Sequence, residues 1–282
     1  MKFSVIIVTP RNYVHSEAFA ETAETVHAGL RALGHEAVLT RSLEVPSGRR
    51  PIIFGANLLA TFKVEPPPRS ILYNLEQVQH GSDWLTPGLL DLFRRFELWD
   101  YSERNADALV AMGVPRPQVV PISYTPSLTR IPHGPEDLDV LFYGSLNDRR
   151  RAVLDALRAQ GVKVETLYGV FGPARDAVIA RAKLVLNVHF YEAKVFEAVR
   201  VSYLLANRRA VVSETCADRE EEAPFANALA FAPYEQLVAT CQRLLADDAA
   251  RTALAARGFE VMHQRSPVPF LRAALAHKRM AA

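Results

Sequence analysis

The chain has 282 residues, 49% hydrophobic and 23% charged, which is the composition of a folded globular protein and excludes a disordered one. Its 33 basic and 31 acidic residues leave a net charge of +2, which gives no electrostatic basis for binding nucleic acid or a membrane surface. No apolar run approaches the roughly 18 residues of a membrane span. The two cysteines lack metal-ligand spacing, so we expect a reduced, cytoplasmic protein.

Short β-branched runs alternate with helical patterns through the first half of the chain. The pattern predicts strands at residues 3–9, 36–40, 51–56, 70–75, 96–101 and 118–123. A helix is expected between the first two strands, with Ser16 as its candidate N-cap and Gly34 as its candidate end. Further helices are expected at 86–96 and 103–113. Residues 1–124 are therefore predicted to form a strand-rich α/β domain.

Residues 125–137 break this alternation. They carry three prolines, a glycine and little periodicity. Turn-forming residues over this length, between two regular regions, are typical of a linker between domains.

The alternation starts again at residue 138 and continues to the end of the chain. Strands are predicted at 140–145, 162–169, 183–190, 210–214 and 228–232, and the last helices at 249–264 and 268–280. Short, continuously apolar strands are typical of parallel sheets covered by helices on both faces. We therefore expect an α/β protein with two Rossmann-like domains that face a central cleft. The last helix is a candidate to pack back on the first domain.

Two loops of the second domain carry residues suited to an anion, since ligands of open α/β sheets bind at the carboxyl ends of the strands. Gly144 follows the first strand, and Arg149 lies at the start of the next helix, where free N–H groups favour an anion. The alternative is a tight turn with solvated arginines.

The second loop lies in residues 184–213, where Asn187 and His189 end a strand. The helix is expected to begin near Glu192 or Ala193, which places Lys194 in its first turn. A cation is unfavourable there unless an anion is bound, so Lys194 indicates a ligand. The alternatives are a Lys194–Glu197 helix pair and a structural role for His189.

The stretch LNVHFYEAKVFEAVRVSYLLANRRAVVSE (186–214) resembles the donor-binding region of GT-B glycosyltransferases, above all bacterial family 1-like and spore-maturation-protein-like enzymes. Asn187 falls on their strand-end asparagine, and Arg200 with Val201 falls on the start of their next helix motif. The loop VLFYGS (140–145) resembles their glycine loop. The resemblance covers about residues 138–265.

The resemblance implies a bacterial enzyme that moves a sugar from a nucleotide-sugar to an unknown acceptor, which could be a glycan, a lipid-linked molecule, a protein or a small molecule. It implies no metal and no other cofactor. From the resemblance together with the two loops described above, the residues expected at the donor diphosphate are Gly144, Arg149, Asn187, His189, Lys194 and Arg200.

The same comparison gives the candidates for the ribose or sugar. The family's ribose-binding glutamate falls at Tyr203 and its glycine at Arg208. Glu192 and Glu197 are therefore expected to contact the ribose or the sugar, beside Tyr203.

The first domain is expected to supply the acceptor side and any catalytic base. His15 after the first strand and Glu76 after the fourth are the main candidates, with His80 and Asp100 also near strand ends. The alternative for each is a capping or surface role. His133, His263 and His277 are expected to be exposed.

Two other functions stay open at this point. The chain could bind a nucleotide-sugar without transferring it, which the tyrosine at position 203 favours. It could also be a sugar-nucleotide epimerase-type enzyme on the same scaffold.

Overall fold

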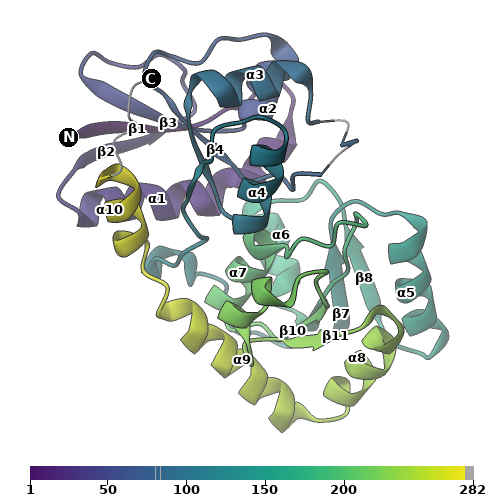
Figure 1. Ribbon diagram of the computed structural model, residues 1–282. Coiled ribbons are helices and arrows are strands. Elements are labelled where there is room, and N and C mark those ends of the chain that lie inside the picture. Colours follow the sequence, from purple (N-terminus) through teal and green to yellow (C-terminus); the bar gives the residue numbers. More distant parts are fainter. Residues whose placement is uncertain (80, 83, 277–282) are drawn as a thin grey trace. The chain divides into compact units, whose positions relative to one another are not determined.

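The computed structural model describes residues 1–79, 81–82 and 84–276 (Figure 1). His80 and His277 lie outside the described residues. The chain divides into two compact units: unit 1 comprises Met1–Thr125 and the C-terminal segment from Ser266, and unit 2 comprises Pro126–Arg265.

Unit 1 is built on a six-stranded sheet in the order β2-β1-β3-β4-β5-β6, and all its strand pairs are parallel. The strands are β1 (Lys2–Ile7), β2 (Glu36–Thr40), β3 (Arg49–Phe54), β4 (Ile71–Asn74), β5 (Glu97–Asp100) and β6 (Gln118–Val119). Each corresponds to a strand predicted from the sequence. Strand β4 and residues 51–54 of β3 are buried, because their apolar side chains are covered on both faces of the sheet.

The helices of unit 1 are the 3₁₀ helix η1 (Val14–Phe19) and the α-helices α1 (Ala20–Ala32), α2 (Ala56–Phe62), α3 (Pro87–Arg95), α4 (Glu103–Ala111) and α10 (Pro267–Ala276). The expectation that Ser16 caps the first helix is wrong. Ser16 is fully buried inside η1, and α1 begins only at Ala20. Helix α2, which the sequence did not indicate, follows Gly55 in a left-handed conformation (φ 91°).

Helix α10 belongs to unit 1 although it ends the described chain. It packs against α1, and a Cβ atom added to Gly29 would lie 2.6 Å from Leu271 Cδ1. Glycine at position 29 therefore lets the two helices approach closely.

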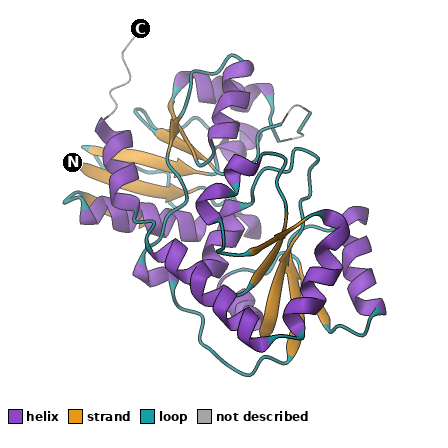
Figure 2. Cartoon of the chain, turned by 60° about the horizontal axis from the view of Figure 1, so that its bottom comes forward, coloured by secondary structure: helices purple, strands orange, loops and turns teal. Residues whose placement is uncertain are grey.

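Unit 2 is built on a five-stranded parallel sheet in the order β11-β10-β9-β7-β8 (Figure 2). Its strands are β7 (Leu138–Tyr143), β8 (Val164–Leu167), β9 (Ala182–Asn187), β10 (Val211–Glu214) and β11 (Ala230–Ala232). Its helices are α5 (Asp148–Ala159), α6 (Gly172–Ile179), α7 (Ala198–Ala206), α8 (Leu237–Leu245) and α9 (Asp248–His263), with short 3₁₀ helices η2 (Pro126–Leu128), η3 (Arg219–Glu221), η4 (Ala223–Phe225) and η5 (Tyr234–Gln236).

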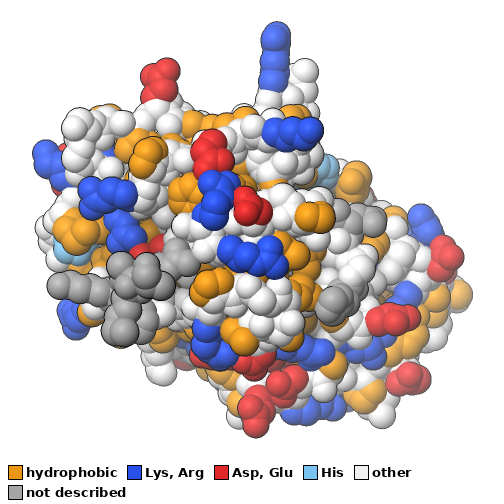
Figure 3. Space-filling model, turned by 45° about the horizontal axis from the view of Figure 1, so that its top comes forward, with side chains coloured by type: hydrophobic (Ala, Val, Ile, Leu, Met, Phe, Trp, Pro, Cys, Tyr) orange, Lys and Arg blue, Asp and Glu red, His pale blue; other side chains and the backbone are white. Residues whose placement is uncertain are grey.

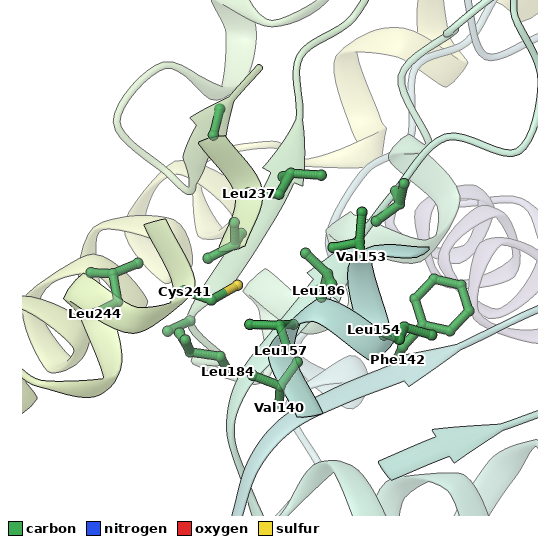
Figure 4. Close-up of a cluster of buried hydrophobic side chains, with 14 of the residues drawn as sticks. Val140, Phe142, Val153, Leu154, Leu157, Leu184, Leu186, Leu237, Cys241 and Leu244 are labelled. Carbon is green, nitrogen blue, oxygen red and sulfur yellow. The ribbon is translucent and has the colours of Figure 1, made fainter. Parts of the chain in front are cut away.

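A buried cluster holds α5 and α8 on one face of this sheet (Figure 4). Leu154 and Leu157 of α5 pack with Phe142, Leu184 and Cys241, and each of these is fully buried. Because alternate residues of β7 and β9 also point to the opposite face and are buried there, both faces are covered. Because both faces are covered, the loops at the carboxyl edge of the sheet are where a ligand can bind.

Residues 126–137, which we expected to be a linker, are part of unit 2. Arg130 and Ile131 each donate a backbone N–H to Asn207 Oδ1 at 2.8 Å, beyond the end of α7. The Thr129 hydroxyl donates to the Ala206 carbonyl at 2.8 Å. These hydrogen bonds hold the segment against the end of α7. The local sequence pattern cannot predict them, because the partners are distant in the sequence.

Charged side chains show no segregation by sign on the face in Figure 3, where basic and acidic groups are interspersed. This agrees with the net charge of +2. Within the described residues, no helix has both the length and the apolar character needed to cross a membrane.

Candidate functional site

The carboxyl ends of β7, β9 and β10 lie side by side in unit 2, because these strands are neighbours and parallel. Six charged side chains meet at this edge, from the end of β10 and from the loops and helices that follow β7 and β9. We call them the cation cluster: Arg149, Arg150, Lys194, Arg200, Glu197 and Glu214. Residues from helix α5, which follows the glycine loop, thus meet residues from the stretch 184–213.

Gly144 ends β7 with a φ of 133°, where other residues are strained. A Cβ atom at this position would lie 2.9 Å from Arg200 Nη2. The Gly144 N–H is already bonded to the Leu167 carbonyl at 3.0 Å. The glycine therefore provides room for the Arg200 side chain and does not offer its own N–H to a ligand.

Helix α5 positions two arginines over the edge of the sheet. Asn147 caps it by accepting a hydrogen bond from the Arg150 backbone N–H at 2.9 Å. Arg149 donates both terminal nitrogens to Glu214 and lies 4.0 Å above the Tyr234 ring. The bidentate bond and the ring fix the plane of this guanidinium.

Arg150 is almost fully buried beneath the cluster. Its guanidinium donates to the Val188 carbonyl at 2.8 Å, to the Ser145 carbonyl at 2.7 Å and to Glu197 Oε1 at 2.9 Å. Burial lowers the pKa of Arg150 to about 10, which still leaves it charged at pH 7. Because its donors are committed, Arg150 holds the loops together.

The expected start of the helix in 184–213 is wrong. Helix α7 begins at Ala198, and Lys194 lies in the preceding loop with a φ of 46°. Long-range bonds fix this loop: the Phe196 N–H donates to Glu221 Oε2 at 3.2 Å, and Asn147 Nδ2 donates to the Phe190 carbonyl at 3.1 Å. These bonds and the burial of Phe196 override the helical periodicity of the sequence.

The cation in the first turn of the helix is therefore Arg200 and not Lys194. Arg200 Nη1 donates to Asn187 Oδ1 at 2.9 Å and lies 2.5 Å from Glu197 Oε2. Lys194 Nζ lies 3.1 Å from Glu214 Oε1. The Glu197 carboxylate, at the N-cap of α7, is the anion that offsets the Arg200 charge at this helix start.

The cluster carries more positive than negative charge. Glu214 pairs with Arg149 and Lys194, and Glu197 pairs with Arg150 and Arg200. Four cations thus face two carboxylates, which leaves an excess of two positive charges. Such an arrangement is preorganised to hold an anion of about two charges.

His189 lies among these charges and is only 1% exposed. Its backbone N–H donates to Glu214 Oε2 at 3.1 Å, but neither ring nitrogen has a hydrogen-bond partner among the described residues. Burial lowers the pKa of His189, so its ring is neutral at pH 7. Buried polar groups are nearly always hydrogen-bonded, so the ring indicates a place for a ligand or a water molecule.

The residues expected at the ribose or sugar are placed differently from one another. Glu192 is exposed in the loop before α7, whereas the Glu197 carboxylate is bonded to two arginines of the cluster. Tyr203 donates its hydroxyl to Asp176 Oδ2 at 2.7 Å and accepts a bond from Arg130 Nε at 3.1 Å. The Tyr203 hydroxyl therefore ties α7 to α6 and to the segment 126–137.

Unit 1 carries a second polar group, at the carboxyl ends of β4 and β5. Glu76 accepts a bond from Asn57 Nδ2 at 3.3 Å, and its backbone carbonyl accepts from Asn74 Nδ2 and Asn105 Nδ2. Both amides also donate to Asp100, which is fully buried. Burial raises the pKa of Asp100 to about 7 and also raises the pKa of Glu76.

His15 lies in η1 after β1, half-buried, with its ring 5.4 Å from the Tyr13 ring. Glu76 and His15 thus both occur at the carboxyl edge of the unit 1 sheet. Of the two, Glu76 is held by the larger network.

Glu214 is the cluster carboxylate that the sequence analysis missed. It is the last residue of a buried parallel strand next to the strand that ends at Asn187. The sequence signal that could have identified Glu214 is its place directly after the apolar run AVVS (210–213), at the end of a predicted strand. Within the described ranges, no group of three or more His, Cys, Asp and Glu residues could hold a metal ion.

No protein-family profile matches the chain. Two uncharacterised proteins of Acanthamoeba polyphaga mimivirus are similar to it. One is 28% identical over 191 residues, which cover 63% of this chain and 59% of that protein, and the other is 33% identical over 107 residues, which cover 37% and 12%. The chain thus matches less than two thirds of the length of either relative. Both are viral, so the bacterial origin that we expected is unsupported.

Solved structures resemble the chain over nearly its whole length. Anabaena HepE, solved with UDP and glucose, is 12% identical with a TM-score of 0.67, covering 99% of this chain and 100% of HepE. WaaG, a glycosyltransferase involved in lipopolysaccharide biosynthesis, is 13% identical with a TM-score of 0.59, covering 96% and 98%. AviGT4, a glycosyltransferase of avilamycin A biosynthesis, is 16% identical with a TM-score of 0.52, covering 98% of each.

These likenesses establish the fold. The chain has the GT-B fold of glycosyltransferases, with two parallel α/β units, as expected from the sequence.

Proposed function

We propose that this protein is a glycosyltransferase that moves a sugar from a nucleotide-sugar to an acceptor. The observation that carries the proposal is the cation cluster of unit 2, with its excess of two positive charges around the unpartnered ring of His189. The GT-B fold, shared with glycosyltransferases and with a protein solved with UDP and glucose, supports it.

Arg149, Lys194 and Arg200 are proposed to bind the diphosphate of the donor. Negative charge grows on this diphosphate as the sugar leaves, and fixed cations stabilise that charge without reorganisation. Asn187 orients Arg200, and Gly144 gives it room. Because these side chains supply the positive charge, we propose that the transfer needs no metal and no other cofactor.

His189 is proposed to donate a hydrogen bond from its neutral ring to the donor phosphate or sugar. Glu192, which is exposed on the same loop, is the carboxylate free of the cluster's ion pairs and is proposed to bind the ribose or the sugar. Glu197 and Tyr203 would then act by holding α7 in place through the bonds described above.

Glu76 and His15 are the proposed candidates for the base that accepts the proton of the acceptor hydroxyl. Burial raises the pKa of Glu76 toward the pH at which a general base works best. The acceptor could be a glycan, a lipid-linked molecule, a protein or a small molecule.

A second candidate function is nucleotide-sugar binding without transfer. The observation in its favour is that Glu197 and Tyr203, two of the three residues expected at the ribose or sugar, are committed to intramolecular bonds.

A nucleotide screen tests these proposals. The melting temperature of the full chain is measured with UDP-, GDP-, ADP- and dTDP-sugars, and we expect one nucleotide to raise it. The matching nucleotide-sugar is then incubated with the protein, and release of free nucleotide distinguishes transfer or hydrolysis from binding alone. If no nucleotide raises the melting temperature, both proposals fail.

A further inference from the structure

Glu214, at the end of β10, contacts two separate parts of the candidate site. Its carboxylate accepts two bonds from Arg149 of α5, lies 3.1 Å from Lys194 Nζ, and accepts the His189 backbone N–H at 3.1 Å. These partners belong to α5 and to the loop between β9 and α7, while Glu214 ends β10. One carboxylate thus ties two cations and the unpartnered histidine to the edge of the sheet.

The energetics of this carboxylate require its partners. The Glu214 side chain is 1% exposed, and a buried unpaired carboxylate is very costly. Burial by itself raises the pKa of Glu214, but hydrogen bonds from Arg149 and Lys194 bring it below its usual value. The group is therefore ionised at neutral pH.

Arg149 and Lys194 depend on Glu214 in return. Their side chains are 30% and 37% exposed. Without Glu214, Lys194 loses this ion pair and Arg149 keeps only its stacking on Tyr234 and its longer bond to the His189 carbonyl among its described contacts, so both side chains gain rotamer freedom. Ordering a long cationic side chain costs conformational entropy. Because Glu214 orders both side chains when the protein folds, ligand binding does not have to supply that entropy.

From this geometry we infer that Glu214 is a positioning residue for donor binding, which holds Arg149 and Lys194 in the arrangement that receives a diphosphate. This inference rests on the function proposed above. Glu214 itself does not contact the ligand, since two anions repel; it acts through the two cations and through the His189 backbone.

Charge alone and positioning predict opposite effects of removing the carboxylate. Glu214→Gln raises the net charge of the cluster by one, and a purely electrostatic role therefore predicts tighter binding of an anion. Positioning predicts weaker binding, because Arg149 loses its bidentate partner and the new amide donor faces the Arg149 donors. The sign of the change separates the two roles.

The experiment is a calorimetric titration of the folded full chain with pyrophosphate and with UDP, GDP, ADP, dTDP and CDP. For Glu214→Gln we expect roughly ten- to a hundredfold weaker binding, the range for losing a hydrogen bond to a charged group. The control is Glu97→Gln, which removes an arginine-paired carboxylate of unit 1 and should leave binding unchanged.

A second variant keeps the inference testable if Glu214→Gln does not fold. Glu214→Asp keeps the charge but withdraws the carboxylate by one methylene, so it cannot satisfy Arg149, Lys194 and the His189 N–H together. Positioning predicts that Glu214→Asp also binds weakly, whereas neutralisation alone predicts wild-type affinity.

A double-mutant cycle with Arg149→Gln completes the test. If Glu214 acts through Arg149, the double variant binds little worse than Arg149→Gln alone. Tighter or unchanged binding by Glu214→Gln, or wild-type affinity of Glu214→Asp, overturns the inference and leaves the proposed function standing. Failure of the wild-type chain to bind any of these diphosphates overturns both.

Discussion

At the scale of single residues, the ring of His189 is a buried polar group of the candidate site in unit 2 whose hydrogen bonding the free protein leaves incomplete. Both ring nitrogens lack a partner among the described residues, although the side chain is buried. An unsatisfied buried polar group costs about 1–3 kcal/mol, so its presence indicates a use for the ring in the bound protein. A substitution of His189 can therefore leave the stability of the free protein unchanged, or raise it, while it lowers the affinity for the ligand.

His189→Leu should preserve or raise the stability of the free protein and weaken ligand binding. The leucine removes the unpaired nitrogens and also the donor proposed for the phosphate or sugar. Thermal melting with and without the nucleotide found in the screen measures both effects. A variant that melts at a lower temperature without ligand, yet shows the full ligand-induced rise, would falsify the role given to this ring.

The same variant should change the response of stability to acid. Burial lowers the pKa of His189 below 6.5 in the folded state, so the unfolded chain binds a proton at higher pH than the folded one. The stabilising effect of the neutral ring is complete above about pH 6.5 and is lost as pH falls through the lower folded pKa. Urea unfolding from pH 8 to pH 5 should show a smaller loss of stability for His189→Leu than for the wild type.

Arg200→Ala should weaken binding of the donor nucleotide by about 1.5–3 kcal/mol, the range for hydrogen bonds to charged groups. Arg200 Nη1 is held by Asn187 and Glu197, so the loss affects a cation that is already oriented. Isothermal titration provides the measurement. Arg151→Ala is the matched control, because Arg151 is exposed and pairs with exposed Asp148; equal losses in both variants would contradict a specific site.

At the scale of elements, the strands could be predicted and the loop before α7 could not. Short apolar runs such as VLF (140–142) and LVL (184–186) are a local property that suffices to identify a buried parallel strand. The conformation of residues 190–197 depends instead on Glu221 and Asn147, which are distant in sequence. The sequence therefore identified Lys194 and Arg200 as site candidates but assigned the helix start to the wrong one.

The turn between β7 and α5 gives a prediction at this scale. Gly144→Ala should weaken nucleotide binding as well as stability, because its Cβ would lie 2.9 Å from Arg200 Nη2 and displace that guanidinium. Gly161→Ala is the matched control: Gly161 also has a positive φ, at the end of α5, but nothing lies within 4 Å of its added Cβ. We expect Gly161→Ala to lower the melting temperature without changing nucleotide affinity, so equal affinities in the two variants would count against the close approach.

At the scale of the whole molecule, unit 1 is formed by two separate segments of the chain, because the C-terminal segment from Ser266 belongs to it and not to unit 2. The sequence showed two α/β regions, because the alternation of strands and helices stops and restarts between residues 125 and 138. It could not show that residues 126–137 bond to the end of α7, since Asn207 lies more than 70 residues further along the chain. The side of the last helix that packs on α1 likewise depends on the distant Gly29.

This division predicts that α10 stabilises unit 1 alone. Leu271 is fully buried against Gly29, and truncating a buried leucine to alanine costs about 2–5 kcal/mol. Leu271→Ala should therefore lower the unfolding temperature of unit 1, whereas the cation cluster lies wholly in unit 2 and should keep its nucleotide affinity. Calorimetry with and without nucleotide, beside the exposed control Arg272→Ala, measures both quantities. Weaker nucleotide binding by folded Leu271→Ala would show that the last helix supports the site of the other unit, because the substitution touches no residue of the cluster.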